Sequence, residues 1–410
     1  MIALVEHLRR LLRIHPGWYA LLAAVALTLI GCFAIGTVRE AEGAKQLYFW
    51  LPAALFVMLV CMLPHPRWLG RMAYPLAILT LVALVFLIAP GVPRSIVPIR
   101  NGAKSWIALT STMTLQPSEF AKIAFVLAMA WHLRYRESYR TFLGLLAPFL
   151  IMFVPVALIL KQPDLGTAML FAPTLFAMLV AAGAKLRHLG TLAAIGVVVV
   201  GANVAIIAID PPHAQSNSRE DRLPSWVHVM KPHQEKRFAA MMWPERYAKR
   251  EAFQGLTAKR MIAAGGLTGL GRERAAVLIR WNGLPEPHND MIFAVICCRW
   301  GCVGGVIVVA LYLVLTMSLG LIAVRSKDPF VRLSLVGFAA MIFTQAAYNI
   351  AMTLGMIPIT GITLPFISYG GSSLLASFMM IGLALNFAAR PPKWLARPSF
   401  EYEPTEVMLQ

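Results

Sequence analysis

Acidic and imidazole side chains are crowded into the segment LPEPHND at 284–290, which directly precedes a long apolar run. A carboxylate at the start of a helix can act as a general base, and Asp is also among the best N-cap residues. If the segment were extended, Glu286, His288 and Asp290 would share one face, where they could ligate a metal ion. We take Asp290 as the candidate catalytic base and leave the N-cap and the metal site open as alternatives.

Two further polar stretches border apolar runs. In QPSEFAK at 116–122, Glu119 and Lys122 are three residues apart and share one face of a helix. They can form a self-neutralising ion pair that lets the helix insert, or the charged wall of an internal cavity. In KQPDLGT at 161–167, Lys161 and Asp164 lie where Pro and Gly interrupt a helix. This stretch is either an ordinary polar turn or the place where Asp164 pairs with a cation on another helix.

The segment GMIPITGITLPFISYGGSS at 355–373 is apolar but rich in Pro and Gly. Proline removes a backbone donor and breaks helices, so the segment cannot be one straight helix. Irregular backbone at membrane depth must be buried in protein or line a cavity. We therefore predict a re-entrant or broken segment that contains Ser368 and Gly370.

Long, nearly uncharged runs must position these groups. Of 410 residues, 59% are hydrophobic and 14% are charged, whereas a soluble protein carries about 25% charged residues. Runs of about 18 or more apolar residues indicate membrane-spanning helices. We predict an all-α polytopic membrane protein with about ten transmembrane helices, at 18–38, 47–63, 72–90, 117–133, 142–160, 166–183, 188–209, 291–324, 332–354 and 372–389.

Lys and Arg are concentrated in every second connection, beginning with Arg9, Arg10 and Arg13 before the first run. By the positive-inside rule, these connections and both termini are cytoplasmic. The net charge of +18 is thus accounted for by topology and requires no nucleic-acid partner. A large outer loop at 210–288, between helices 7 and 8, breaks the pattern. It is basic and contains aromatic residues such as Trp226, so it either lies near anionic lipid headgroups or gathers an anionic, lipid-linked substrate.

Cysteines and glycines give no second chemistry. All five cysteines fall in predicted spans, which argues against a disulfide framework and favours packing roles. Cys298 and Cys302 are one turn apart on a helix, but further metal ligands are lacking nearby. Gly266, Gly269 and Gly271 follow no strand, so they shape turns and do not bind a nucleotide.

In their order along the chain, these stretches resemble the SEDS family (shape, elongation, division and sporulation proteins, of the RodA/FtsW type). The resemblance covers roughly residues 15–392 and rests on NGAKSWI (101–107), QPSEFAK (116–122), KQPDLGTA (161–168), IAAGGLTGLG (262–271), LPEPHNDMIFAV (284–295) and GMIPITGITLPFISYGGSS (355–373). It implies one membrane domain over 1–392 and a cytoplasmic tail at 393–410.

The resemblance implies a peptidoglycan glycosyltransferase of the bacterial cytoplasmic membrane. Such proteins polymerise lipid II at the outer face, usually in complex with a class B penicillin-binding protein. The family's essential acid falls on Asp290, and its supporting residues fall on Glu119, Lys122 and Asp164. We group with these, as candidates for substrate binding or site support, Lys161, Glu286, His288, Ser368 and Gly370.

An inverting displacement from an undecaprenyl pyrophosphate needs a base for the acceptor hydroxyl and positive charge for the leaving group. We expect Asp290 to be the base. Lys122, basic residues of the long loop or a divalent cation such as Mg or Mn would neutralise the pyrophosphate. No metal site formed by the protein alone is expected.

The chain departs from the family near this site. Cys298 and Arg299 stand where the family usually has an acidic pair, and we expect Arg299 to snorkel or to pair with a compensating acid. Two other functions stay open beside the polymerase: a lipid II flippase, and a non-catalytic scaffold that recruits the crosslinking partner.

Overall fold

The computed structural model describes residues 15–93, 95–98, 104–110, 113–212, 230, 232–248 and 252–390. Several predictions lie outside these residues: those on the tail at 393–410, on Arg9, Arg10 and Arg13, and on Trp226.

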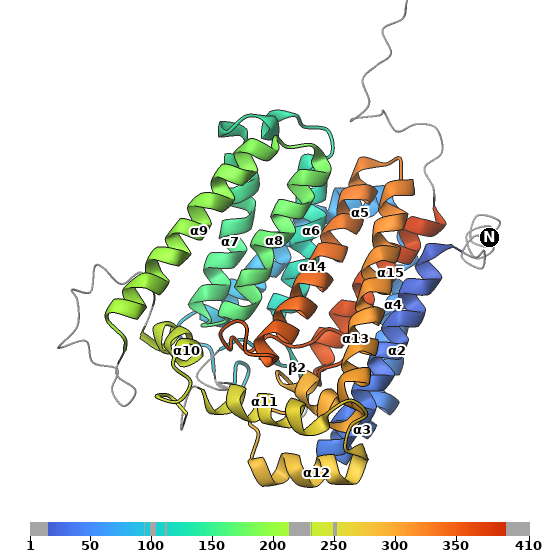
Figure 1. The fold of residues 1–410 in the computed structure, drawn as a ribbon. Coiled ribbons are helices and arrows are strands. Elements are labelled where there is room, and N and C mark those ends of the chain that lie inside the picture. Colours follow the sequence, from blue (N-terminus) through green and yellow to red (C-terminus); the bar gives the residue numbers. More distant parts are fainter. Residues whose placement is uncertain are drawn as a thin grey trace, which may run out of the picture.

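Helices make up nearly all of the regular structure in the described part of the chain. Figure 1 shows the long helices packed side by side as a bundle, with α11 and α12 lying across one end. The helices are α2 (Pro16–Val38), α3 (Glu40–Lys45), a π-helix (Gln46–Trp50), α4 (Leu51–Cys61), α5 (Pro66–Ile88), α6 (Pro117–Leu133), two 3₁₀ turns (Ser138–Arg140 and Leu143–Leu145), α7 (Leu146–Lys161), α8 (Leu165–Ala182), α9 (Leu186–Ile209), α10 (Pro232–Met242), α11 (Phe253–Gly265), α12 (Gly271–Asn282), α13 (Ile292–Arg325), α14 (Pro329–Thr353) and α15 (Gly371–Ala389). Two short antiparallel strands, β1 (Ile107–Ala108) and β2 (Thr114–Leu115), pair beside them.

Each predicted span corresponds to a helix. Within the described ranges, nine helices are long and apolar enough to cross a membrane, the second of them running through α3, the π-helix and α4. The tenth is α6, which has 17 residues and carries Glu119 and Lys122 near its start. Almost every side chain of α6 is buried, so the helix that carries these two charges is surrounded by protein.

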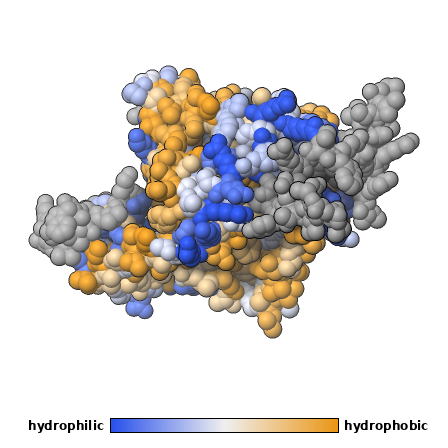
Figure 2. All heavy atoms as spheres, turned by 90° about the horizontal axis from the view of Figure 1, so that it is seen from above, coloured by the Kyte–Doolittle hydropathy of each residue, from blue (hydrophilic) through white to orange (hydrophobic). Residues whose placement is uncertain are grey.

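The bundle presents apolar side chains on its outside. Seen from above the view of Figure 1, hydrophobic residues lie at the upper left and along the lower edge, and hydrophilic ones gather across the middle and upper right (Figure 2). Large exposed side chains on the outer helices include Leu22, Phe33, Ile78, Leu79, Val197 and Val198. A continuous exposed apolar surface of this kind is typical of a membrane-embedded protein. The chain is therefore a polytopic helical membrane protein.

The start of the first described helix, α2, and the end of the last, α15, lie at the same side of the bundle. Arg390, just after α15, donates to the carbonyl oxygens of Pro64 (2.9 Å) and Leu63 (2.9 Å) in the α4–α5 connection. A Cβ added to Gly17, at the start of α2, would lie 2.7 Å from the Leu385 side chain. Helices α11 and α12 lie at the opposite end (Figure 1), which we call the loop end.

Helix α13 is broken, which the sequence did not indicate. Gly301 has φ +69, so the run predicted as one span at 291–324 consists of two helices joined at this residue. The turn at 266–270 occupies the break: Cys302 N–H donates to Gly266 O (2.8 Å), and Leu270 N–H donates to Cys298 O (2.9 Å). The backbone of this turn thus pairs the groups that the break leaves free, as membrane burial requires.

We predict that Gly301→Ala lowers the thermal stability of the protein. The left-handed conformation costs a residue with a Cβ ~1–2 kcal/mol, and the new Cβ would lie 2.2 Å from the Leu267 carbonyl oxygen. Gly320→Ala, farther along α13, is the matched control because nothing lies within 4 Å of its added Cβ. Thermal unfolding in detergent should show a lower midpoint for the first variant alone. Equal midpoints would contradict this account of the break.

Candidate active site

Asp290 lies in the turn between α12 and α13, at the loop end. Its backbone carbonyl accepts a hydrogen bond from Asn349 Nδ2 of α14 (2.8 Å). The N-cap of α13 is Met291, with no side-chain capping bond, so the N-cap alternative for Asp290 is wrong. A Cβ added to Gly361 would lie 3.3 Å from Asp290 Oδ2. The carboxylate therefore faces bare backbone, and within the described ranges it accepts no hydrogen bond.

Burial makes Asp290 a stronger base than an ordinary aspartate. The pKa of Asp290 is raised to about 6, mainly by burial, with smaller contributions from the nearby Glu286 carboxylate and from Asp164. The Arg237 guanidinium of α10 acts in the opposite direction and lowers this pKa. A carboxylate with a pKa close to neutral is mostly ionised at pH 7 and still accepts a proton readily.

His288 is buried beside a carboxylate that the sequence did not single out. Its Nε2 lies 3.5 Å from Glu42 Oε2 of α3 and 3.8 Å from Glu286 Oε2. Burial lowers the pKa of His288, while both carboxylates raise it. Glu286 also accepts a hydrogen bond from Asn289 Nδ2 (2.6 Å). These contacts hold the turn on the Asp290 side in one conformation.

The predicted broken segment is confirmed, and it lies against the Asp290 turn. We call residues 354–370, between α14 and α15, the return segment. Ser368 Oγ donates to Asn289 O (2.7 Å) and accepts from Leu364 N–H (2.7 Å). Tyr369 N–H donates to His288 O (2.9 Å). Ser368 therefore fastens the return segment to the turn that carries Asp290.

Gln46 of the π-helix holds the return segment from another side, through its Nε2 atom and the carbonyl oxygens of Ile367 (3.4 Å) and Ser368 (3.3 Å). Gly370 is the N-cap of α15, with an extended φ of 162°. An added Cβ there would meet only Ser373 Cβ, at 3.8 Å. No contact at this position thus requires a glycine.

Glu119 and Lys122 form the ion pair that their spacing predicts. Lys122 Nζ lies 3.0 Å from Glu119 Oε1 and 2.9 Å from Oε2, with both side chains almost fully buried. Lys122 also donates to Gln345 Oε1 of α14 (2.8 Å), and Gln345 Nε2 donates to Thr363 O of the return segment (3.0 Å). The pair thus joins α6 to the segment that faces Asp290.

Asp164 connects this pair to Asp290 through its charge. It is the N-cap of α8: its Oδ1 accepts from Thr167 N–H (2.9 Å), and its Oδ2 accepts from Gln116 Nε2 (3.4 Å). Both partners are neutral. Of the two alternatives for this stretch, direct pairing of Asp164 with a cation is not found among the described residues, although the charge of Lys122 on α6 lowers the pKa of Asp164. Burial raises the pKa of Asp164, and Glu119 raises it further. Lys161 is exposed at the end of α7, away from these contacts.

The metal alternative is wrong for the part of the chain described. No group of three or more His, Cys, Asp or Glu side chains in that part converges to hold an ion. The turn at 284–290 is not extended, because Glu286 has φ +46, so Glu286, His288 and Asp290 do not share a face. A divalent cation that arrives with a pyrophosphate stays a prediction.

Of the two alternatives for Arg299, pairing with an acid is not found among the described residues. Its guanidinium donates to Phe33 O (2.6 Å) and Thr37 Oγ1 (2.7 Å) of α2, and lies 4.3 Å from the Trp300 ring centroid. Cys298, beside it, is fully buried. Arg299 therefore ties the broken helix α13 to α2 without an acidic partner.

Sequence reasoning missed four side chains of this site: Glu42, Arg237, Gln345 and Asn349. Gln345 and Asn349 are polar residues four apart within the apolar α14, which is the signal that marks functional residues in membrane helices. Glu42 and Arg237 lie in polar connections, where one more charge carries no such signal.

Comparisons with known proteins agree with this architecture. The sequence model of the family described as "Cell cycle protein" (FtsW, RodA, SpoVE) matches residues 15–391. The probable peptidoglycan glycosyltransferase FtsW of Trichlorobacter lovleyi is 29% identical over 90% of this chain and 92% of its own length.

Two solved structures share the fold. A chain from a peptidoglycan synthase complex, studied for its coordination of polymerization and crosslinking, superimposes with a TM-score of 0.73 at 28% identity, over 90% of this chain and 97% of that one. The rod shape determining protein RodA of Thermus thermophilus does so with a TM-score of 0.63 at 25% identity, over 92% of this chain and 97% of that one.

Proposed function

We propose, from the premise that this chain belongs to the SEDS family of cell cycle proteins, that it is a peptidoglycan glycosyltransferase that polymerises lipid II. The observation that carries the proposal is the buried Asp290 carboxylate, whose pKa is raised to about 6. It faces the bare backbone of Gly361 in a turn held by Asn349 and Ser368. A free, preorganised base of this kind suits abstraction of a proton from a hydroxyl.

The reaction is a displacement at the anomeric carbon of the donor sugar. A hydroxyl of the acceptor sugar forms the new bond to this carbon, and its proton passes to Asp290. The bond from the same carbon to the diphosphate oxygen breaks, and the diphosphate leaves with the electron pair. A divalent cation such as Mg or Mn, held by the diphosphate itself, would supply further positive charge.

Lys122 supports the site from a distance. It is bonded to Glu119 and Gln345 and is 1% exposed, so it is not available to a leaving group. We assign the Glu119–Lys122 pair and Asp164 to positioning of the return segment and the Asp290 turn. The loop end then faces the outer side of the bacterial cytoplasmic membrane, where a class B penicillin-binding protein would crosslink the strands.

Polymerisation by the purified chain tests this function directly. With lipid II, alone or together with a class B penicillin-binding protein, we expect glycan strands resolvable by gel electrophoresis. The same protein in vesicles should not move labelled lipid II between leaflets. If the protein transports lipid II but makes no strands, it is a flippase and not a polymerase. If it shows neither activity with the partner present, the scaffold function is the one that remains.

The pH dependence of polymerisation should follow Asp290. A general base must be ionised, so kcat/KM should rise with pH through a midpoint of about 6 and then level off. Three neighbouring charges set this midpoint: Glu286 and Asp164 raise it, and Arg237 lowers it. Glu286→Gln removes a raising charge, so its midpoint should move to lower pH. A midpoint that stays fixed or moves upward would exclude Asp290 as the titrating group.

A further inference from the structure

A pocket beside Asp290 has a mixed apolar and cationic lining. It is a partly open cleft of about 40 Å³ between α10, α11 and the start of the return segment. Its apolar walls include Met241, Met352, Ile357 and Ile359. Among the residues that the structure describes, Arg237 and Lys259 are the charged side chains of the lining, and no carboxylate belongs to it. The pocket therefore suits a ligand that is both anionic and apolar.

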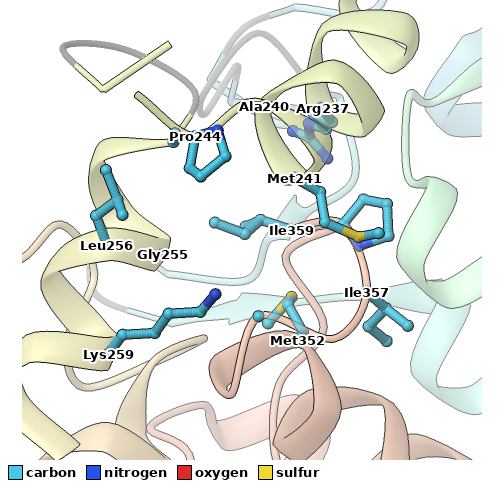
Figure 3. Close-up of a pocket in the computed structure, with 13 residues that line it drawn as sticks. Arg237, Ala240, Met241, Pro244, Gly255, Leu256, Lys259, Met352, Ile357 and Ile359 are labelled. Carbon is cyan, nitrogen blue, oxygen red and sulfur yellow. The ribbon is translucent and has the colours of Figure 1, made fainter. Parts of the chain in front are cut away.

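The two cations come from different helices. Figure 3 shows Lys259 extending from α11 into the pocket, and Arg237 lying at another side of it on α10. A Cβ added to Gly355 would lie 2.4 Å from Lys259 Nζ. The lysine side chain can therefore occupy this position only because residue 355 has no side chain. Neither cation has a hydrogen-bond or ion-pair partner of its own in the described ranges, and both charges are available to a ligand.

The pocket adjoins the candidate base. Arg237 lies close enough to Asp290 for its charge to act on that carboxylate. The return segment provides a second connection, because Ile359 lines the pocket and Gly361, two residues later, contacts Asp290 Oδ2. Arg237 thus belongs both to the lining of the pocket and to the charges that act on Asp290.

We propose that this pocket binds the diphosphate and the first isoprenoid units of the lipid carrier, with Arg237 and Lys259 as the two ligands of the diphosphate. This inference rests on the proposed function and assigns the leaving-group side of the reaction. When the bond from the sugar to the diphosphate breaks, the oxygen that takes the electron pair lies beside two cations. Fixed positive charge at that position stabilises the transition state.

Equilibrium binding of farnesyl diphosphate to the purified full chain, in an uncharged detergent, tests the pocket. Arg237→Gln and Lys259→Gln should each weaken binding about tenfold, since hydrogen bonds to charged groups are worth about that much. Arg260→Gln is the matched control, because Arg260 is exposed on the same helix and does not line the pocket. Unchanged affinity in both pocket variants would overturn the proposal.

Two further arms identify the ligand chemistry. Farnesol, which lacks the diphosphate, should bind much more weakly than farnesyl diphosphate. Phosphatidylglycerol should not displace the probe at equal concentration. If it does, the pocket is a general site for anionic lipids and the proposal falls. Lys259→Arg keeps the positive charge, so its affinity for farnesyl diphosphate should stay within threefold of wild type. A loss of affinity as large as that of Lys259→Gln would also overturn the proposal.

Asp290→Asn separates this inference from the proposed function. The variant should bind farnesyl diphosphate at least as tightly as wild type, because a neighbouring negative charge has been removed. Polymerisation by Asp290→Asn would remove Asp290 as the base and leave the pocket intact. Wild-type strands together with unchanged binding by Arg237→Gln and Lys259→Gln would remove the pocket and leave the polymerase intact.

Discussion

Asp290→Asn is expected to reduce the rate of lipid II polymerisation by about 10²–10⁴-fold, the usual contribution of a positioned general base. The amide keeps the size of the carboxylate but cannot accept the proton. The Asp290 carboxylate accepts no capping hydrogen bond from the N–H groups of α13, and its fixed contact with Asn349 uses the backbone carbonyl. The fold should therefore survive the change, and initial rates of strand formation from labelled lipid II measure the loss.

Glu273→Gln provides the matched control for Asp290→Asn. Glu273 lies on α12 at the same end of the protein and is exposed, so its substitution makes the same change in net charge outside the site. We expect its rate to stay within twofold of wild type. An Asp290→Asn protein that folds, binds its partner and still polymerises at a comparable rate would contradict the assignment of the base.

Lys122→Met is expected to lower the free energy of unfolding by ~3–5 kcal/mol, because it leaves the Glu119 carboxylate buried without its cation. Both side chains of the pair are almost fully buried, so solvent screens their interaction little. The variant also loses the bond to Gln345, which holds the return segment through Thr363. Polymerisation should fall with stability, and denaturant unfolding in detergent measures the first effect.

The double variant Lys122→Met, Glu119→Gln separates the cost of leaving the Glu119 carboxylate unpaired from the loss of the lysine's other contacts. It removes the stranded charge, so it should recover most of the lost stability while polymerisation stays low. The exposed pair Glu137–Arg140 has the same spacing, and Glu137→Gln should cost under ~1 kcal/mol. Wild-type stability in Lys122→Met alone would show that the pair does not hold the site together.

Arg299 shows how the chain tolerates its departure from the family. A cation on a membrane helix must find acceptors, and here they are the Phe33 carbonyl and the Thr37 hydroxyl, both on α2. The contact joins α2 to α13 at the break around Gly301. The residues that stand in place of an acidic pair therefore attach α13 to α2, and the Arg299 guanidinium has neutral acceptors there.

The sequence alone determined the membrane-spanning runs, because hydrophobic runs of sufficient length and the absence of charge are local properties. It also determined the Glu119–Lys122 pair, since residues three apart share a helix face. The broken return segment followed from Pro and Gly at 355–373 for the same local reason. The family, and with it the choice of Asp290, followed from the order of the motifs.

Only the tertiary structure decided which distant groups meet. Glu42 reaches His288, Arg237 reaches Asp290, and Gln345 joins Lys122 to Thr363 across three elements. The break in α13 also depends on distant contacts, because its free backbone groups pair with Gly266 and Leu270 in the connection between α11 and α12. Such contacts depend on how helices pack. The physical reason is that burial and charge at each position are set by neighbours that local patterns do not specify.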